Sequence, residues 1–261
     1  MLKISKIILY DEPSVPEIRI IELAEFLNKK IKIDTEIRDS FLNHFNANQN
    51  TASQIASCKI LNPYAPFERH RPTIDEIALE EQDSRKPTHD NIILYDGFEL
   101  QNVFNEVIPK SELLSDIFHL IFTTRLTCTF DHSDYRYHGR SVICSNPSII
   151  STTGIIEAPA KPREYYLKLY EKFSQGLNLD SIKDEFKGRF LEHHDKNLNL
   201  VVRGYAMQAI FYYLTGQAFC ESKDCMLYNA HWQEDLLHSQ IQVGVLCDQH
   251  KNILESIVSS V

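Results

Sequence analysis

The sequence lacks long hydrophobic runs, a basic charge balance and an excess of glycine or proline. Its 261 residues include 8 Gly and 10 Pro, which excludes fibrous and low-complexity classes. No stretch approaches the roughly 20 apolar residues of a membrane-spanning helix, and the apolar run in the N-terminal MLKISKIILYDEP is too short for a secretion signal. The net charge of −9 argues against a nucleic-acid-binding protein, which usually carries a basic face. We therefore expect a cytoplasmic protein that binds neither membrane nor nucleic acid.

Cysteine is scarce, and its placement is informative. In a reducing cytoplasm, the six cysteines should serve burial, catalysis or metal binding rather than disulfides. Three stand alone and are interpreted as small buried apolar residues: Cys58, Cys128 and Cys144. The other three lie close together near the C-terminal end of the sequence.

These three cysteines and one histidine form two short-range pairs, Cys220-x4-Cys225 and Cys247-x2-His250. Two such pairs joined by a longer segment are typical of a closed tetrahedral metal site. Thiolates and an imidazole favour Zn²⁺ over Mg²⁺, Ca²⁺ or Mn²⁺. The spacing therefore predicts one structural zinc ion, ligated by Cys220, Cys225, Cys247 and His250.

The hydrophobic pattern predicts an α/β fold, with a mixed twisted sheet and flanking helices. Ile4–Tyr10 and Ile31–Ile37 alternate like strands, and a helix runs between them from Pro16 to about Asn28. This β-α-β unit predicts at least two parallel strands. Residues 38–91 are rich in Asn, Pro and polar residues and are expected to form an insertion of helices and loops.

The remaining pattern predicts short strands and then helices. We expect strands at Ile92–Tyr95, Phe118–Phe122, Val142–Ser145 and Ile149–Thr153, the last with a polar edge. We expect helices at Leu100–Val107, Arg163–Phe173, Ser181–Phe190, Asn197–Leu214, His231–Val243 and Asp248–Val258. Gly216 is placed to cap the long helix. Without repeats or a distinct linker, we predict a single domain over residues 1–261, with a zinc-stabilised C-terminal part at 218–261.

The cysteine pattern resembles the zinc-binding tail of the archaemetzincins, a family of zinc metallopeptidases. That family runs its catalytic motif H-E-x-x-H-x-x-G-x-x-H-C into Cys-x4-Cys-x-Met and closes with Cys-x2-Cys. Here the pairs are Cys220-x4-Cys225 and Cys247-x2-His250, so a histidine replaces the last cysteine. The family methionine falls on Leu227, so a methionine beneath a catalytic metal is not expected.

The same register indicates that the catalytic motif is lost. With Cys220 as the final cysteine of the motif, its glycine falls on Gly216. The three histidine positions fall on Ala209, Tyr213 and Phe219, and the glutamate position falls on Ile210. None of these side chains can replace the histidine ligands, and Ile210 cannot transfer a proton. We therefore predict a buried core helix and no catalytic residues.

The resemblance also implies an archaemetzincin-like (metzincin) fold, clearest over about residues 118–250. It implies that Phe118–Phe130, Gly139–Ser145 and Ser148–Gly154 are the strands before the helix, including an edge strand along which a peptide lies. The first functional hypothesis is thus a pseudoenzyme that binds a peptide or protein in an exposed groove. Strand addition is then expected at Ile149–Gly154, and no polar cluster at a groove floor near Ala209 and Tyr213.

The alternative is an active metal-dependent hydrolase or peptidase with a relocated metal site. Its candidate ligands are His132, Asp134, His138 and His194, of which the first three lie in the segment Asp131–His138. A polar turn between two strands gives the same pattern and is the favoured interpretation. The identity of the substrate or partner and the oligomeric state are left open.

Overall fold

A computed structural model describes residues 3–81, 92–178 and 180–259. Its main feature is a five-stranded sheet in the order β2-β1-β4-β8-β7. These strands are β1 (Lys6–Tyr10), β2 (Asp34–Arg38), β4 (Ile117–Thr123), β7 (Val142–Ile143) and β8 (Ser148–Ser151). All neighbours are parallel except β7, which runs antiparallel to β8. The predicted mixed sheet and its parallel β-α-β start are confirmed.

A second sheet has three strands in the order β3-β5-β6, comprising β3 (Leu94–Asp96), β5 (Leu126–Asp131) and β6 (Arg136–Arg140). Strand β3 is parallel to β5, and β5 forms an antiparallel hairpin with β6. The chain passes from β6 directly into β7 after a single residue, Ser141. The end of one sheet therefore lies next to the edge of the other.

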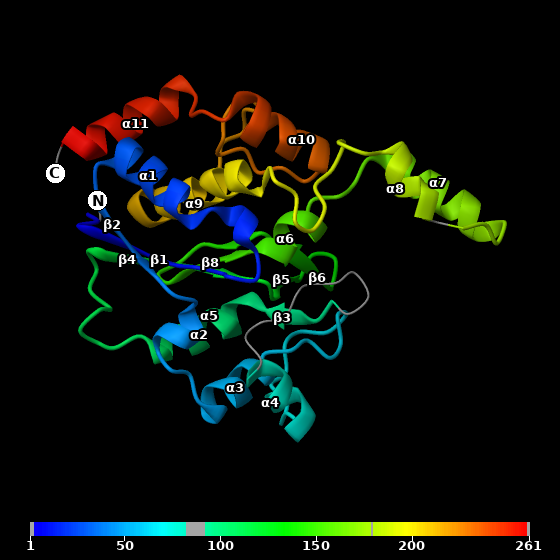
Figure 1. Ribbon diagram of the computed structural model, residues 1–261, viewed down its shortest axis with the longest axis horizontal. Coiled ribbons are helices and arrows are strands. Elements are labelled where there is room, and N and C mark those ends of the chain that lie inside the picture. The colour runs from blue at the N-terminus through cyan, green and yellow to red at the C-terminus, as the bar shows by residue number, and fades with distance from the viewer. Residues whose placement is uncertain (1–2, 82–91, 179, 260–261) are drawn as a thin grey trace.

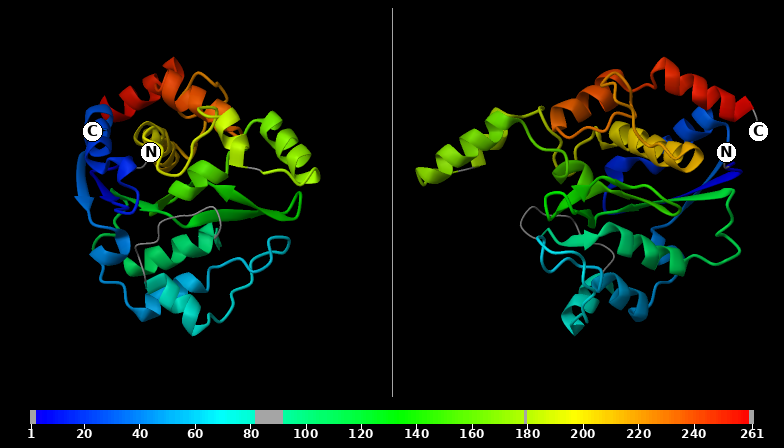
Figure 2. Two further views of the ribbon diagram at one scale, coloured as in Figure 1. Left: turned by 45° about the vertical axis from the view of Figure 1, so that its right-hand side comes forward. Right: turned by 180° about the vertical axis from the view of Figure 1, so that it is seen from behind.

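Helices cover both faces of the main sheet (Figure 1). On one side lie η1 (Pro16–Ile18), α1 (Ile20–Ile31) and α9 (Leu198–Thr215), with α10 (Gln233–Leu237), the π-helical turn η3 (His238–Val243) and α11 (Asp248–Ser259) outside them. On the other side lie α2 (Phe41–His44), α3 (Gln49–Ala56), α4 (Ile74–Glu81) and α5 (Gly97–Val107). Helix α6 (Thr152–Glu157) follows β8, and α7 (Arg163–Ser174) and α8 (Asp180–Glu185) project as an arm (Figure 2).

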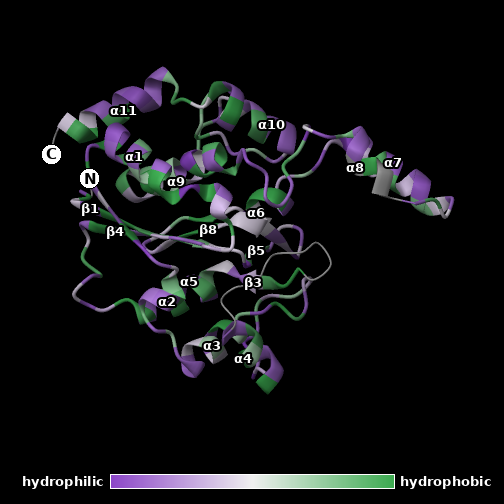
Figure 3. Cartoon of the chain, in the orientation of Figure 1, coloured by the Kyte–Doolittle hydropathy of each residue, from purple (hydrophilic) through white to green (hydrophobic). Residues whose placement is uncertain are grey.

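Burial explains the hydrophobic pattern of these elements. Helix α9 is buried on most of its circumference because it lies between the sheet and the outer helical layer. Hydrophobic residues concentrate on α9 and the central strands, whereas α11 is largely hydrophilic (Figure 3). No helix in the part of the chain that the structure describes combines the length and apolar composition needed to cross a membrane.

The prediction that Ile149–Gly154 offers an edge for strand addition is wrong. Strand β8 lies between β4 and β7, all four of its residues are buried, and the chain turns into α6 at Thr152. The polar appearance of the end of β8 and the start of α6 comes from hydroxyl groups that donate to backbone carbonyls. These bonds are Ser151 to Arg125 at 2.7 Å, Thr152 to Thr123 at 3.2 Å and Thr153 to Thr124 at 2.6 Å. On this side of the main sheet, β7 is the edge strand.

The predicted insertion of residues 38–91 contains α2, α3 and α4 within its described part, and residues 82–91 lie outside that part. Helix α4 is fastened to the sheets through the buried carboxylate of Glu80. This carboxylate accepts hydrogen bonds from Tyr95 Oη at 2.6 Å and Arg125 Nε at 2.9 Å, and Lys59 Nζ lies 3.4 Å away. Ion pairs as well as apolar contacts therefore join the insertion to the rest of the fold.

Candidate metal centre

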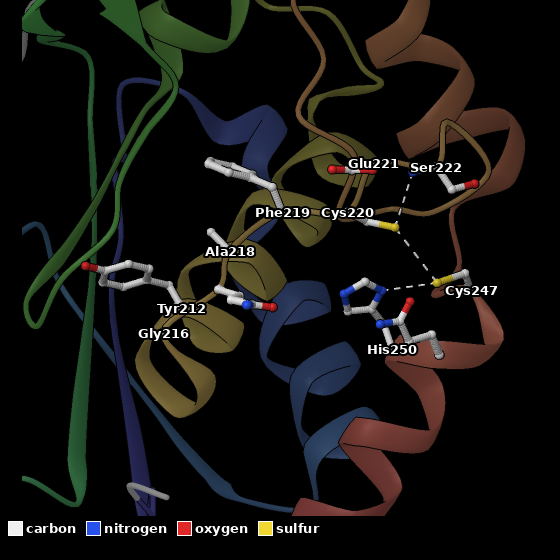
Figure 4. Close-up of a pocket in the computed structure, with 11 residues that line it drawn as sticks. Tyr212, Gly216, Ala218, Phe219, Cys220, Glu221, Ser222, Cys247 and His250 are labelled. Carbon is white, nitrogen blue, oxygen red and sulfur yellow. Dashed lines mark hydrogen bonds between the residues drawn. The ribbon is translucent and has the colours of Figure 1, made fainter.

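The fold brings together the four residues predicted to bind zinc. Cys220 and Cys225 lie in the loop after α9, whereas Cys247 and His250 lie at the start of α11. Their ligand atoms all lie within 4.8 Å of one another. The Sγ atoms of Cys220 and Cys247 are 4.0 Å apart, and His250 Nδ1 lies 3.1 Å from Cys247 Sγ and 3.9 Å from Cys225 Sγ. Figure 4 shows Cys220, Cys247 and His250 pointing toward one another.

These separations match the edges of a small coordination tetrahedron. Zinc bonds of about 2.3 Å to sulfur and about 2.0 Å to nitrogen place two sulfurs roughly 3.8 Å apart, and a sulfur and a nitrogen roughly 3.5 Å apart. Three thiols and one imidazole also form a donor set that suits Zn²⁺. The residues present therefore fit one zinc ion with four protein ligands.

The surroundings shift the pKa of His250 and Cys247 toward the form that binds a metal, and the pKa of Cys225 away from it. Burial raises the pKa of Cys225 to about 12 and lowers the pKa of His250, which favours the neutral imidazole that a metal needs. Burial also acts to raise the pKa of Cys247, but hydrogen bonds, led by one from the backbone N–H of His250, outweigh it and lower that pKa. The backbone N–H groups of Ser222 and Cys247 donate to Cys220 Sγ and Cys225 Sγ, each at 3.4 Å.

Local backbone geometry explains how the two pairs meet. Gly216 ends α9 in the left-handed conformation, with φ +77°, and its N–H donates to the Tyr212 carbonyl at 2.7 Å. This confirms the predicted cap and directs the chain into the cysteine loop. The Met226 N–H then donates to the Val245 carbonyl at 2.8 Å. This bond holds the loop against the segment that leads into α11.

A groove of about 440 Å³ lies beside this centre. Residues 139–144, which include β7, form one wall, and Tyr205, Gln208 and Tyr212 of α9 line it as well. Tyr212, Ala218 and Phe219 also line the neighbouring cavity that contains Cys220, Cys247 and His250. The groove and the cavity of the candidate metal centre therefore share three lining residues, which Figure 4 shows beside Cys220 and His250.

The groove exists, but its floor is not where the sequence predicted it. Ala209 and Ile210 are fully buried. The ring of Tyr213 packs on Phe118 of β4, with ring centres 5.2 Å apart, and its hydroxyl donates to the Ser115 carbonyl at 2.5 Å. The groove residues of α9 are Tyr205, Gln208 and Tyr212 instead. Of the positions mapped from the family motif, Phe219 does line the groove and is 46% exposed.

Within the described residues, only two places gather three or more potential metal ligands, and the groove is neither of them. One is the Cys3His cluster. The other joins Asp131, Asp134 and His138 on the β5–β6 hairpin. There His138 Nε2 lies 2.9 Å from an Asp134 oxygen, which also accepts a 2.7 Å bond from Arg136 Nε.

Two histidines that the sequence suggested as ligands lie outside both clusters. The ring of His132 packs edge-on against Phe130, with centres 5.1 Å apart. His194 pairs with Glu17 through a 3.2 Å contact between Nδ1 and Oε2. Of the four ligands suggested for a relocated site, Asp134 and His138 lie together with Asp131, and His132 and His194 do not join them.

The isolated cysteines differ in exposure. Cys58 and Cys128 are buried, as predicted, and burial raises the pKa of each thiol to about 12. Cys144 is partly exposed and lines the groove, although burial raises its pKa to about 12 too. Thiols with such high pKa values are poor nucleophiles.

A solved structure and a protein-family model are similar to this chain. The chain is similar to the crystal structure of a zinc-dependent peptidase from Methanocorpusculum labreanum (strain Z), with 10% identity and a TM-score of 0.43 over 97% of this chain and 99% of that chain. No curated protein matches it. A family model described as "Probable metallopeptidase family (DUF6775)" matches residues 3–257. Because this match spans nearly the whole sequence, the chain belongs to this family of probable metallopeptidases.

Proposed function

We propose that this chain is a zinc-stabilised, peptide-binding relative of the archaemetzincins that has lost their catalytic centre. The main support for the proposal is that α9 lines the groove with Tyr205, Gln208 and Tyr212. An amide and two phenols are not a donor set that holds zinc, whereas two histidines one helical turn apart are.

The metal in this proposal is structural. A zinc ion with Cys220, Cys225, Cys247 and His250 as ligands is coordinatively complete and has no open position for water or substrate. Its contribution is to join the loop after α9 to the start of α11. Because the cluster shares lining residues with the groove, the ion also fixes Ala218 and Phe219 at the groove wall.

Peptide binding is supported by the edge strand in the groove wall. An edge strand presents unpaired backbone N–H and C=O groups along one side, and an extended peptide can pair with them. Strand β7 is such an edge and lines the groove with Val142 and Ile143. The sequence suggested strand addition at Ile149–Gly154, but that segment is not at the sheet edge. We therefore assign strand addition to β7.

Metal content and peptidase activity, measured on the same samples, test this proposal. We expect one zinc per purified chain by mass spectrometry, and none in a Cys220→Ser, Cys247→Ser double variant. Cys144→Ser is the matched control, since Cys144 is also partly exposed but lies outside the cluster. We expect no hydrolysis of a mixed peptide pool at any zinc concentration. Zinc-dependent cleavage by the wild type would refute the non-catalytic role.

The second candidate is a hydrolase whose metal sits on the β5–β6 hairpin. The convergence of Asp131, Asp134 and His138 favours it. It predicts a second metal per chain that survives the double cysteine variant and is lost in His138→Ala. A single metal per chain, unaffected by His138→Ala, would exclude this candidate.

A further inference from the structure

The charge of the groove differs from that of the whole chain. The chain has 36 acidic and 27 basic residues, yet the described lining of the groove contains Arg140 and His231 and no aspartate or glutamate. Arg140 is partly buried at the end of β6, and its Nε donates to Thr129 Oγ1 at 2.7 Å. It forms no ion pair with any residue that the structure describes. A guanidinium in this setting favours an anionic ligand.

Gln208 supplies a second polar group that lacks a partner. Its side chain is 1% exposed, and its Nε2 donates to the Tyr228 carbonyl at 3.1 Å. That bond fixes the amide so that Oε1 is left as a buried acceptor with no donor among the described residues. Since a buried polar atom without a partner is costly, this oxygen is suited to accept an N–H from a ligand in the groove.

Three exposed aromatic side chains border the same groove. Phe98 is 57% exposed, Phe219 46% and Tyr212 41%, and all three belong to its lining. Exposed rings that gather around one cavity favour an apolar group in the ligand. The required ligand thus combines an anion, an N–H donor and an apolar side chain.

We infer that the groove binds the C-terminal end of a peptide, with its terminal carboxylate on Arg140. A peptide N–H then bonds to Gln208 Oε1, and an apolar residue near the chain end packs among Phe98, Tyr212 and Phe219. A chain end fits better than an internal segment because β7 has only two residues and begins two positions after Arg140. This inference rests on the proposed peptide-binding function and specifies its ligand.

Matched peptide pools test the inference. The probes are N-acetylated tetrapeptides randomised over Leu, Val, Phe and Tyr, prepared with a free C-terminal acid or a C-terminal amide. A third pool ends in an amide and carries one internal glutamate. Binding to the full ¹⁵N-labelled chain is followed by chemical-shift changes at the Gln208 side-chain amide and the backbone of residues 139–144. Arg140→Gln is the test variant, and Arg136→Gln on the same strand is its control, because Arg136 lies outside the groove.

We expect the acid pool to bind the wild type about tenfold or more tightly than the amide pool, as for a charge-assisted hydrogen bond. The preference should vanish in Arg140→Gln and persist in Arg136→Gln, with zinc content unchanged in both. Equal binding of the acid and amide pools would overturn the carboxylate inference but leave peptide binding standing. Tight binding of the glutamate pool would show that a side-chain carboxylate is the ligand and would also overturn it. No shift with any pool would refute the proposed function itself.

Discussion

At the residue scale, His119 of β4 is a buried histidine whose surroundings favour its neutral form. It is fully buried, and its Nδ1 lies 3.0 Å from the Tyr10 hydroxyl and its Nε2 2.9 Å from the Glu112 carbonyl. Nε2 must carry the proton because its partner is a carbonyl oxygen, so Nδ1 accepts from Tyr10. Burial lowers the pKa of His119, although the nearby Glu112 acts in the opposite direction.

This histidine predicts a pH-dependent loss of stability. Because its folded-state pKa lies below the unfolded value of about 6.5, the unfolded chain binds more protons between those two values. The stability that neutral His119 contributes is therefore present above about pH 6.5 and is lost as pH falls toward the folded-state pKa. In urea titrations from pH 8 to 5, we expect the unfolding free energy of the wild type to fall more steeply than that of His119→Gln. The difference should be at most about 1.4 kcal/mol per pH unit, and parallel curves would contradict it.

Gly216 gives a second prediction at this scale. Its φ of +77° belongs to the left-handed region, and a Cβ placed there would meet no atom within 4 Å. Gly216→Ala should therefore cost only the backbone strain, about 1 kcal/mol of unfolding free energy. Gly216→Asn should cost less, because asparagine tolerates this conformation better. Chemical denaturation of the three proteins measures this, and a loss above about 3 kcal/mol for alanine would mean that the turn itself had rearranged.

At the element scale, the Glu80 contacts predict how strongly α4 is held. Glu80→Gln would leave Arg125 and Lys59 without the buried carboxylate that faces both. Breaking a buried ion pair by removing one partner costs about 3–5 kcal/mol. Glu81→Gln, one residue later and exposed, should change the unfolding free energy by less than about 0.5 kcal/mol. Equal effects of the two changes would show that this carboxylate does not hold the helix.

The elements also show what the sequence can and cannot predict. The spacing of the cysteines was sufficient to predict the Cys3His cluster, because two short pairs carry a geometric constraint. The face of α9 that lines the groove could not be predicted in this way, because the helix is apolar almost all round. The only guide to that face was the alignment of the sequence with the family motif. That motif indicated Ala209 and Tyr213, whereas the groove contains Gln208 and Tyr212. The edge at Ile149–Gly154 was expected from the family resemblance, whereas the hydroxyls of Ser151, Thr152 and Thr153 are satisfied inside the fold.

No sequence signal marked Arg140 as a residue of the groove. It is the last residue of β6, and its position in the groove depends on the junction between β6 and β7. The close approach of Gly154 to that junction is equally invisible in one sequence. A Cβ at Gly154 would lie 2.2 Å from the Arg140 carbonyl oxygen. Contacts of this kind follow from tertiary packing and not from local propensity.

At the scale of the whole molecule, we expect the stability of the C-terminal part to depend on the metal, and that of the main sheet and α9 not to. The main sheet and α9 form a continuous buried core, which includes Phe118, Leu120, Ala206 and Ile210. Met226 and Leu227 of the loop after α9 belong to the same core. The rest of that loop and the start of α11 are mostly exposed or half-buried, and the four ligand residues bring these two segments together. Stabilisation by a structural zinc is therefore expected to be local to the C-terminal part of the chain, as predicted for residues 218–261.

Hydrogen exchange after metal removal tests this division. We expect a strong chelator to increase amide exchange in residues 217–232 and 244–252, because the loop loses the bonds that join it to α11. Exchange in β1 and β4 should stay slow, since these strands are buried without help from the ligands. Cys247→Ser should give the same pattern without chelator, whereas Cys144→Ser should match the wild type. Uniform loss of protection would instead mean that the metal stabilises the entire fold, and the C-terminal part would then not be a separate unit of stability.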